Sequence, residues 1–171
     1  MVQALKNKHM AWSTIHKACV ALLEEQNYDK VEFILKELIK TEGRRCLEAV
    51  TESGVTPLHF AALSEFPHLI EVLLEYGCSV DAKNEMDETP LHWACSAGNF
   101  ISVLVLVNCG ASIFSDRKGD TPLHWAIESG NIKIAKYLAP RYKALVNRAN
   151  NNGVSPLRLA QLKNIDSEVF A

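Results

Sequence analysis

The chain has 171 residues, of which 48% are hydrophobic and 22% charged, and its formal net charge is −2 at pH 7. This composition is near the average for folded domains, and the nearly neutral charge argues against a nucleic-acid-binding protein. No apolar stretch reaches the roughly 18 residues that a membrane span needs, and Met1 is followed by polar residues rather than a secretory apolar core. We therefore expect an intracellular protein, cytoplasmic or nuclear or both, with neither nucleic-acid nor membrane partners.

The N-terminal 50 residues predict a pair of helices. Residues 13–19 read Ser-Thr-Ile-His-Lys-Ala-Cys, a proline-free form of a motif that recurs further along the chain. A second helix with an apolar face follows, because hydrophobic residues recur there at helical spacing. Its apolar residues are Val31, Phe33, Ile34, Leu35 and Leu38. We expect the regular spacing to break between Thr41 and Arg45.

One tetrapeptide then recurs at spacings of 33, 32 and 34 residues. Threonine is a good helix N-cap, and proline suits the first helical position because the N–H that it lacks has no partner there. Each copy therefore predicts the start of a helix. The copies are Thr56-Pro57-Leu58-His59, Thr89-Pro90-Leu91-His92, Thr121-Pro122-Leu123-His124 and the weaker Ser155-Pro156-Leu157-Arg158.

A second helix is predicted in each of the next three units, because apolar residues return at helical spacing 13 to 17 residues after the motif threonine. Gly98 and Gly130 fall between paired helices, and Gly77 and Gly110 follow a second helix, where glycine closes a helix end without strain. Pro67 predicts the start of one second helix. Ala139-Pro140 predicts that another stops near Leu138.

The motif T-P-L-H-x-A at a period of about 33 resembles the ankyrin-repeat family. The resemblance implies an all-α solenoid of stacked helix pairs with β-turn fingers, in one domain over 1–171. About five repeats are expected, counting imperfect ends. They are an atypical N-terminal cap at 1–50, full repeats at 51–83, 84–115 and 116–149, and a partial C-terminal cap at 150–171. Since only 165–171 remain for a last helix, either that cap is short or the chain is cut from a longer protein, which we favour.

Histidines and cysteines are the residues that could suggest chemistry. His59, His92 and His124 occur once per unit and so should not converge on one site; in the resembling family this residue hydrogen-bonds within and between turns. The five cysteines include no C-x-x-C pair, which argues against disulfide or zinc sites. Phosphate-binding and hydrolase motifs are also missing from the sequence. We expect no enzyme activity, no metal and no cofactor.

A partner site is predicted by the same resemblance, which implies that fingers and first helices line a concave groove. Phe60, Trp93 and Trp125 each follow a motif histidine, and aromatic side chains often anchor protein interfaces. The alternative is that these rings pack between repeats. Residues 51–100 carry one basic and eight acidic side chains, which could steer a basic partner or could simply be solvated. The predicted site is Phe60, Glu85, Met86, Glu88, Trp93, Arg117, Lys118, Asp120 and Trp125, and replacing both tryptophans should weaken binding.

A second contact is predicted on the back of the array. Ile101 and Leu104 lie one helical turn apart, where neighbouring units carry His68 and Glu71 or lysines. They predict either weak self-association of a monomer or docking of a flanking segment, unless they are ordinary exposed hydrophobic residues. Taken together, the sequence predicts a protein–protein interaction module, an adaptor, scaffold or inhibitor that binds another protein or a peptide segment. The alternative is a targeting or regulatory domain of a larger enzyme or membrane protein.

Overall fold

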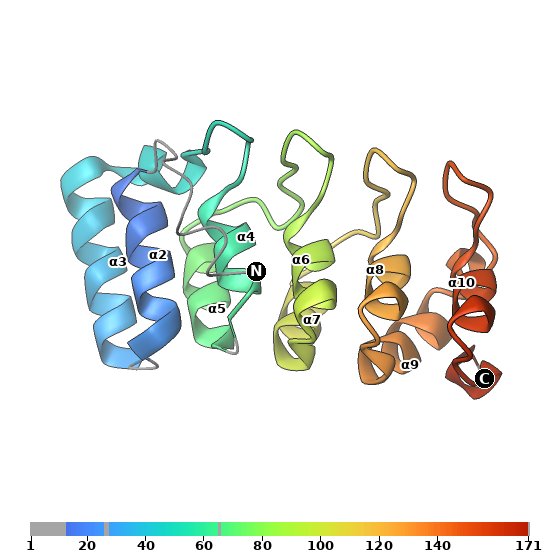
Figure 1. The fold of residues 1–171 in the computed structure, drawn as a ribbon. Coiled ribbons are helices and arrows are strands. Elements are labelled where there is room, and N and C mark those ends of the chain that lie inside the picture. Colours follow the sequence, from blue (N-terminus) through green and yellow to red (C-terminus); the bar gives the residue numbers. More distant parts are fainter. Residues whose placement is uncertain (1–12, 26–27, 65, 171) are drawn as a thin grey trace.

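A computed structural model describes residues 13–25, 28–64 and 66–170 of the chain, and in these residues the regular secondary structure is helical throughout. Residues 1–12 of the predicted N-terminal cap lie outside this part. Figure 1 shows the helices in consecutive units along the array. The elements are α2 (Thr14–Glu25), α3 (Tyr28–Glu42), η1 (Arg44–Glu48), α4 (Pro57–Ala62), α5 (Pro67–Glu75), α6 (Pro90–Ala97), α7 (Phe100–Asn108), α8 (Pro122–Glu128), α9 (Ile132–Arg141), η2 (Lys143–Leu145), α10 (Pro156–Leu162) and η3 (Ser167–Phe170).

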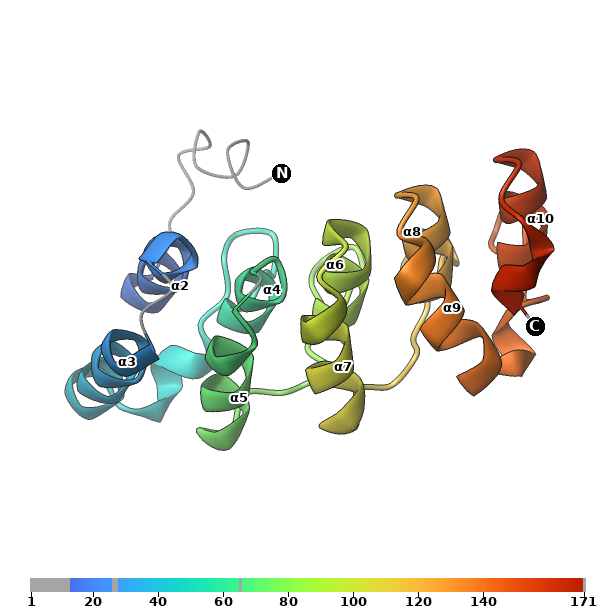
Figure 2. The same ribbon diagram turned by 90° about the horizontal axis from the view of Figure 1, so that it is seen from below.

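The helices form two parallel rows. The first helices of the units, α2, α4, α6, α8 and α10, lie side by side in one row, and α3, α5, α7 and α9 form the other (Figure 2). Loops that we call fingers project from the same end of every unit from α4 onward (Figure 1). A pair of short helices cannot bury its apolar face alone, so each unit is stabilised by the next one. This architecture confirms the predicted all-α solenoid.

The core lies between the two rows. Leu58, Leu91 and Leu123 occupy the same place in successive first helices, and all three are at most 1% exposed. Cys19 and Cys95 are also fully buried, so their thiols fill space in this core. Phe33 differs from the prediction, because it is 66% exposed rather than part of an apolar helix face that packs inward. It lies on α3 in the first unit of the array, where one face has no preceding unit among the described residues.

The predicted helix starts are confirmed at every motif. Thr56, Thr89 and Thr121 are extended N-caps, and the prolines that follow are the first helical residues. Pro67 likewise begins α5.

The prediction for the end of α9 is wrong by about one turn. Helix α9 continues past Leu138 and through Pro140 to Arg141. Proline lacks one backbone N–H, but this loss falls in the last turn of the helix, and Tyr142 still donates to the Leu138 carbonyl at 2.9 Å. Leu138 and Ala139 are both buried, so packing favours the extra turn.

Candidate functional site

Each of the last three fingers is organised by one Asn or Asp side chain, five residues before the helix cap. Asn84 Oδ1 accepts from the backbone N–H groups of Met86 and Glu88, at 2.9 and 3.0 Å. Asp116 Oδ1 and Asn150 Oδ1 accept the equivalent pairs, at 2.8 Å each and at 3.0 Å each. The sequence analysis missed these residues, although their own period of 32 and 34 residues could have revealed them as turn formers.

Neighbouring fingers are joined by backbone hydrogen bonds. Glu85 N donates to Ser53 O at 3.0 Å, Arg117 N to Met86 O at 2.9 Å, and Asn151 N to Lys118 O at 2.9 Å. The fingers therefore form one connected edge rather than independent loops.

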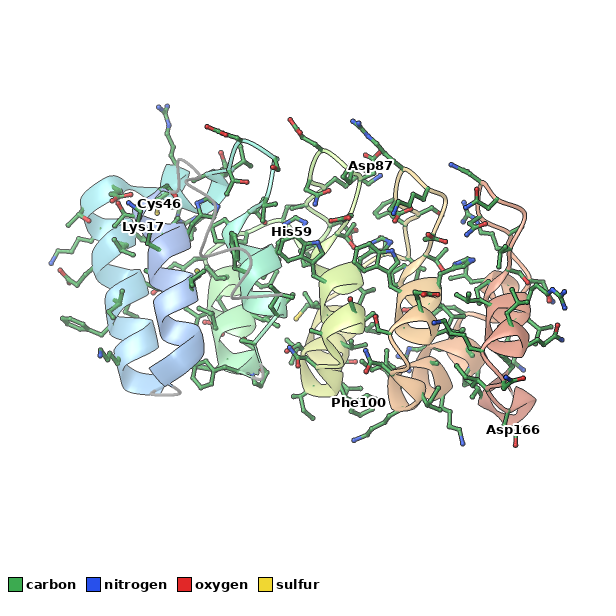
Figure 3. All side chains as sticks on the ribbon, in the orientation of Figure 1. Lys17, Cys46, His59, Asp87, Phe100 and Asp166 are labelled. Atoms are coloured by element: carbon green, nitrogen blue, oxygen red, sulfur yellow. The ribbon has the colours of Figure 1, made fainter. Side chains whose placement is uncertain are left out.

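Close approach between fingers explains a glycine at one tip. At Gly119, whose φ is +80°, a Cβ would lie 2.8 Å from the backbone nitrogen of Asn151, so this place favours glycine. The preceding finger instead carries Asp87 at φ +57°, and Figure 3 shows this residue among the finger tips. Aspartate tolerates the left-handed region better than most residues, which allows a carboxylate at this tip.

The motif histidines tie each helix start to the following finger. In the repeat that begins at Thr56, the backbone N–H of Thr56 donates to His59 Nδ1 at 3.2 Å, and the threonine hydroxyl lies 2.8 Å from the same nitrogen. Since Nδ1 is the acceptor, the proton is assigned to Nε2, which donates to the carbonyl of Glu88 at 3.0 Å. His92 and His124 make the same contacts, to Asp120 O at 3.1 Å and Val154 O at 3.0 Å.

These histidines are neutral structural residues. Burial lowers the pKa of His59 to about 4, and it also lowers the pKa values of His16, His92 and His124. Both ring nitrogens of each histidine make hydrogen bonds, so neither nitrogen is free for a metal or for proton transfer. Within the described residues, His, Cys, Asp and Glu side chains form no group that could hold a metal ion.

The structure corrects two of the predicted anchor residues. Phe60 and Trp93 are 1% and 4% exposed, so neither presents a surface to a partner. Their rings meet edge to face at 5.9 Å, and Trp93 Nε1 donates to Glu88 Oε2 at 2.8 Å. The physical reason is that rings of neighbouring units pack against each other, as in the packing alternative: Phe60 meets Trp93 of the following unit, and Trp93 meets His59 and Phe60 of the preceding one. Trp125 is half-buried, with its indole N–H bonded to Asp116 Oδ2 at 3.1 Å.

The predicted finger residues lie on one face of the array, here called the groove face. It consists of fingers 84–88, 116–120 and 150–154 and the adjoining sides of α6, α8 and α10. Glu85, Met86, Arg117 and Lys118 are exposed, and Glu88 and Asp120 are half-buried. Met86 is 44% exposed at a tip, so it presents an apolar surface among the charged tips.

Charged groups on this face also contact one another. Arg117 Nε lies 3.7 Å from Asp87 Oδ2, so it joins two successive tips.

A hollow of about 550 Å³ opens on the groove face between α8 and α10. Sequence reasoning missed it, because the hollow depends on how two units pack. It is lined by Ser96, Asp116, Lys118, Asp120, His124, Trp125, Glu128, Ser129, Asn150, Asn152, Val154, Leu159 and Leu162.

Comparison with known proteins identifies the class of this fold. A family model for ankyrin repeats in three copies matches residues 67–150 and 102–168. The chain belongs to the ankyrin-repeat family, whose repeats are protein-interaction modules.

Individual relatives include regulators and an enzyme. The chain is 31% identical over 145 residues to the Saccharomyces cerevisiae protein named "Probable 26S proteasome regulatory subunit p28", covering 83% of this chain and 60% of that protein. It is 45% identical over 51 residues to NF-kappa-B inhibitor alpha of Sus scrofa, covering 30% of this chain and 16% of the inhibitor. Palmitoyltransferase Hip14 of Drosophila melanogaster is 43% identical over 58 residues, which are 33% of this chain and 9% of the enzyme. The chain thus spans less than two thirds of each relative.

None of the helices in residues 13–25, 28–64 and 66–170 combines the length and the apolar character that crossing a bilayer would require.

Proposed function

We propose that this chain is a non-enzymatic adaptor, scaffold or inhibitor inside the cell, and that it binds a segment of a partner protein along the groove face. The observation that carries the proposal is the connected edge of fingers, which holds exposed charged and apolar side chains in fixed positions. A preformed surface loses little conformational entropy on binding, so it suits specific recognition. The nearly neutral charge favours a protein partner over nucleic acid or a membrane surface.

The proposed contact set is narrower than the sequence suggested. Phe60 and Trp93 are omitted because they are buried. Glu88 is kept for its exposed part, although one carboxylate oxygen is already used by Asn84 and Trp93. The contact set is Glu85, Met86, Glu88, Arg117, Lys118, Asp120 and Trp125.

A second candidate is a regulatory or targeting domain within a larger enzyme or membrane protein. The match to part of a palmitoyltransferase favours this reading, because there the similar segment is only 9% of the enzyme. The same groove face would then bind a partner or substrate protein of the larger chain.

Site-specific photo-crosslinking should test the groove face. A photoreactive phenylalanine analogue placed at Met86 should capture a defined protein from cell extract, because this side chain is exposed at a finger tip. The matched control places the same analogue at Lys136, which is exposed on α9 in the other helix row. The purified partner should then bind the chain, and Arg117→Ala with Lys118→Ala should weaken binding. Equal crosslinking from both positions, or unchanged binding of the double variant, would contradict the proposal.

We also propose that Ile101 and Leu104 form a second contact on α7, through weak self-association. Ile101 is 52% exposed and Leu104 is half-buried, so one residue presents most of the apolar area. The parent should show a concentration-dependent increase in weight-average mass by sedimentation, and the double variant Ile101→Lys, Leu104→Lys should not. A parent that stays monomeric at high concentration would remove the basis for self-association.

A further inference from the structure

A series of histidine–aromatic contacts runs along the first helices and then stops. The rings of His16 and Phe60 meet edge to face at 5.7 Å, those of His59 and Trp93 at 5.3 Å, and those of His92 and Trp125 at 5.5 Å. In every pair the aromatic residue belongs to the unit after the histidine. The next histidine is His124, and the matching place in the following unit holds Leu159. The described array therefore lacks an aromatic ring at this step.

The hollow on the groove face lies at this step. His124, Trp125 and Leu159 all line it, and its volume of about 550 Å³ falls within the range of sites that bind small molecules. Leu159 and Val154 are only half-buried, and Leu162 is 59% exposed, so the apolar part of the wall is accessible to a bound group. The Trp125 ring is held in place by its contact with His92 and by its hydrogen bond to Asp116.

The walls of the hollow are negatively charged. Asp116, Asp120 and Glu128 line it, whereas Lys118 is the single Lys or Arg among the lining residues. Asp120 is positioned by a neutral group, since its Oδ1 accepts from Asn150 Nδ2 at 2.7 Å. Glu128 lies 3.1 Å from Lys163 Nζ at the rim. Burial lowers the pKa of His124, and Arg148 acts in the same direction, whereas the hydrogen bond to Val154 and the carboxylates of Asp120 and Asp116 act in the opposite direction.

We propose that this hollow receives an arginine side chain from an extended segment of the partner protein. The guanidinium group stacks on the Trp125 ring and pairs with the carboxylate of Asp120, while its alkyl part contacts Leu159. Arginine fits this site better than lysine, because its planar group both stacks on aromatic rings and bonds carboxylates in two places. An uncharged aromatic side chain would fill the gap in the series but would leave the carboxylates without a partner. This inference rests on the proposed function and specifies the partner's chemistry.

A short peptide is the direct probe. The acetylated and amidated peptide Gly-Ser-Arg-Ser-Gly is titrated into the ¹⁵N-labelled chain, and the indole N–H signal of Trp125 is followed by NMR after its assignment with Trp125→Phe. The signal should shift saturably. The same peptide with citrulline, which keeps the shape of arginine but lacks its charge, should bind at least about 10-fold more weakly, because charge-assisted bonds are the strong ones. The proposal would be overturned if the arginine peptide caused no shift. It would also be overturned if a peptide with citrulline or glutamate in place of the arginine shifted the signal equally.

Two variants of the chain test the Asp120 carboxylate and the missing ring at position 159 separately. Asp120→Asn should weaken the arginine peptide about 10-fold, whereas Glu75→Gln, which removes an exposed carboxylate on α5 away from the hollow, should not. Leu159→Trp should complete the ring series, keep the far-UV circular dichroism spectrum and abolish the peptide-induced shift of Trp125. Retained peptide binding by Leu159→Trp would place the arginine elsewhere and so overturn the site.

This test is independent of the photo-crosslinking experiment. If no peptide perturbs Trp125 but the partner captured at Met86 still depends on Arg117 and Lys118, the arginine site is wrong and the proposed function stands. If no peptide perturbs Trp125 and no partner is captured at Met86, both the arginine site and the proposed function are wrong.

Discussion

Replacing Trp93 by alanine should destabilise the fold by about 3 to 5 kcal/mol, the usual cost of removing a buried aromatic side chain. The indole is 4% exposed, and its ring contacts those of His59 and Phe60 edge to face. Its N–H also donates to Glu88 at 2.8 Å, so truncation removes a donor from a half-buried carboxylate. Urea unfolding followed by far-UV circular dichroism measures this loss without relying on tryptophan fluorescence.

Two variants provide the controls for Trp93. Trp125→Ala changes the equivalent residue one unit later, and a smaller loss is expected because this side chain is only half-buried. Trp93→Phe keeps an aromatic ring but removes the N–H donor, which should cost about 1 kcal/mol. If Trp93→Ala were as stable as the parent but no longer bound the partner, Trp93 would be a contact residue, as the sequence first suggested.

Stability should also fall on mild acidification. Between about pH 7.5 and about pH 5, the free energy of unfolding should decrease by about 2 kcal/mol through His59 alone. The ordinary pKa of 6.5 is lowered to about 4 in the folded chain, chiefly by burial. Below pH 6.5 the unfolded chain therefore binds more protons than the folded chain. The stability is fully present above pH 6.5 and is lost progressively as the pH falls toward 4.

The other buried motif histidines should add to this effect. Burial lowers the pKa values of His16, His92 and His124 in the same direction. Protonation at Nδ1 would also remove the acceptor that the helix cap uses, which opposes protonation of the folded form.

Urea titrations at a series of pH values measure the change directly. The variant His59→Gln should be less stable near neutral pH, but its stability should depend on pH less steeply, by up to one proton. A parent whose stability is constant between about pH 7.5 and about pH 5, or a variant with an unchanged slope, would show that His59 is not held neutral by the fold.

Local signals in the sequence were enough for most of the fold. Proline at the first helical position and threonine before it specify a helix start through the backbone alone, and this held at Pro57, Pro90 and Pro122. The prediction for Pro140 failed because packing of Leu138 and Ala139 outweighs one missing N–H in a last turn. The turn in each finger could also have been predicted from Asn84, Asp116 and Asn150, because an Asx turn is a local interaction.

The candidate site was less predictable, because exposure is set by neighbouring units. Trp93 and Trp125 occupy identical places in identical local sequences, Thr-Pro-Leu-His-Trp-Ala, yet one is buried and the other half-buried. At the matching place in the following unit, Trp93 is succeeded by Trp125, whereas Trp125 is succeeded by Leu159. The sequence by itself determined the repeat, the helix starts and the structural role of the histidines, since helix caps are local interactions and the same histidine recurs once in each of three units. The tertiary structure alone decided which rings are covered and where the hollow opens, because both depend on side chains of two units packing against each other.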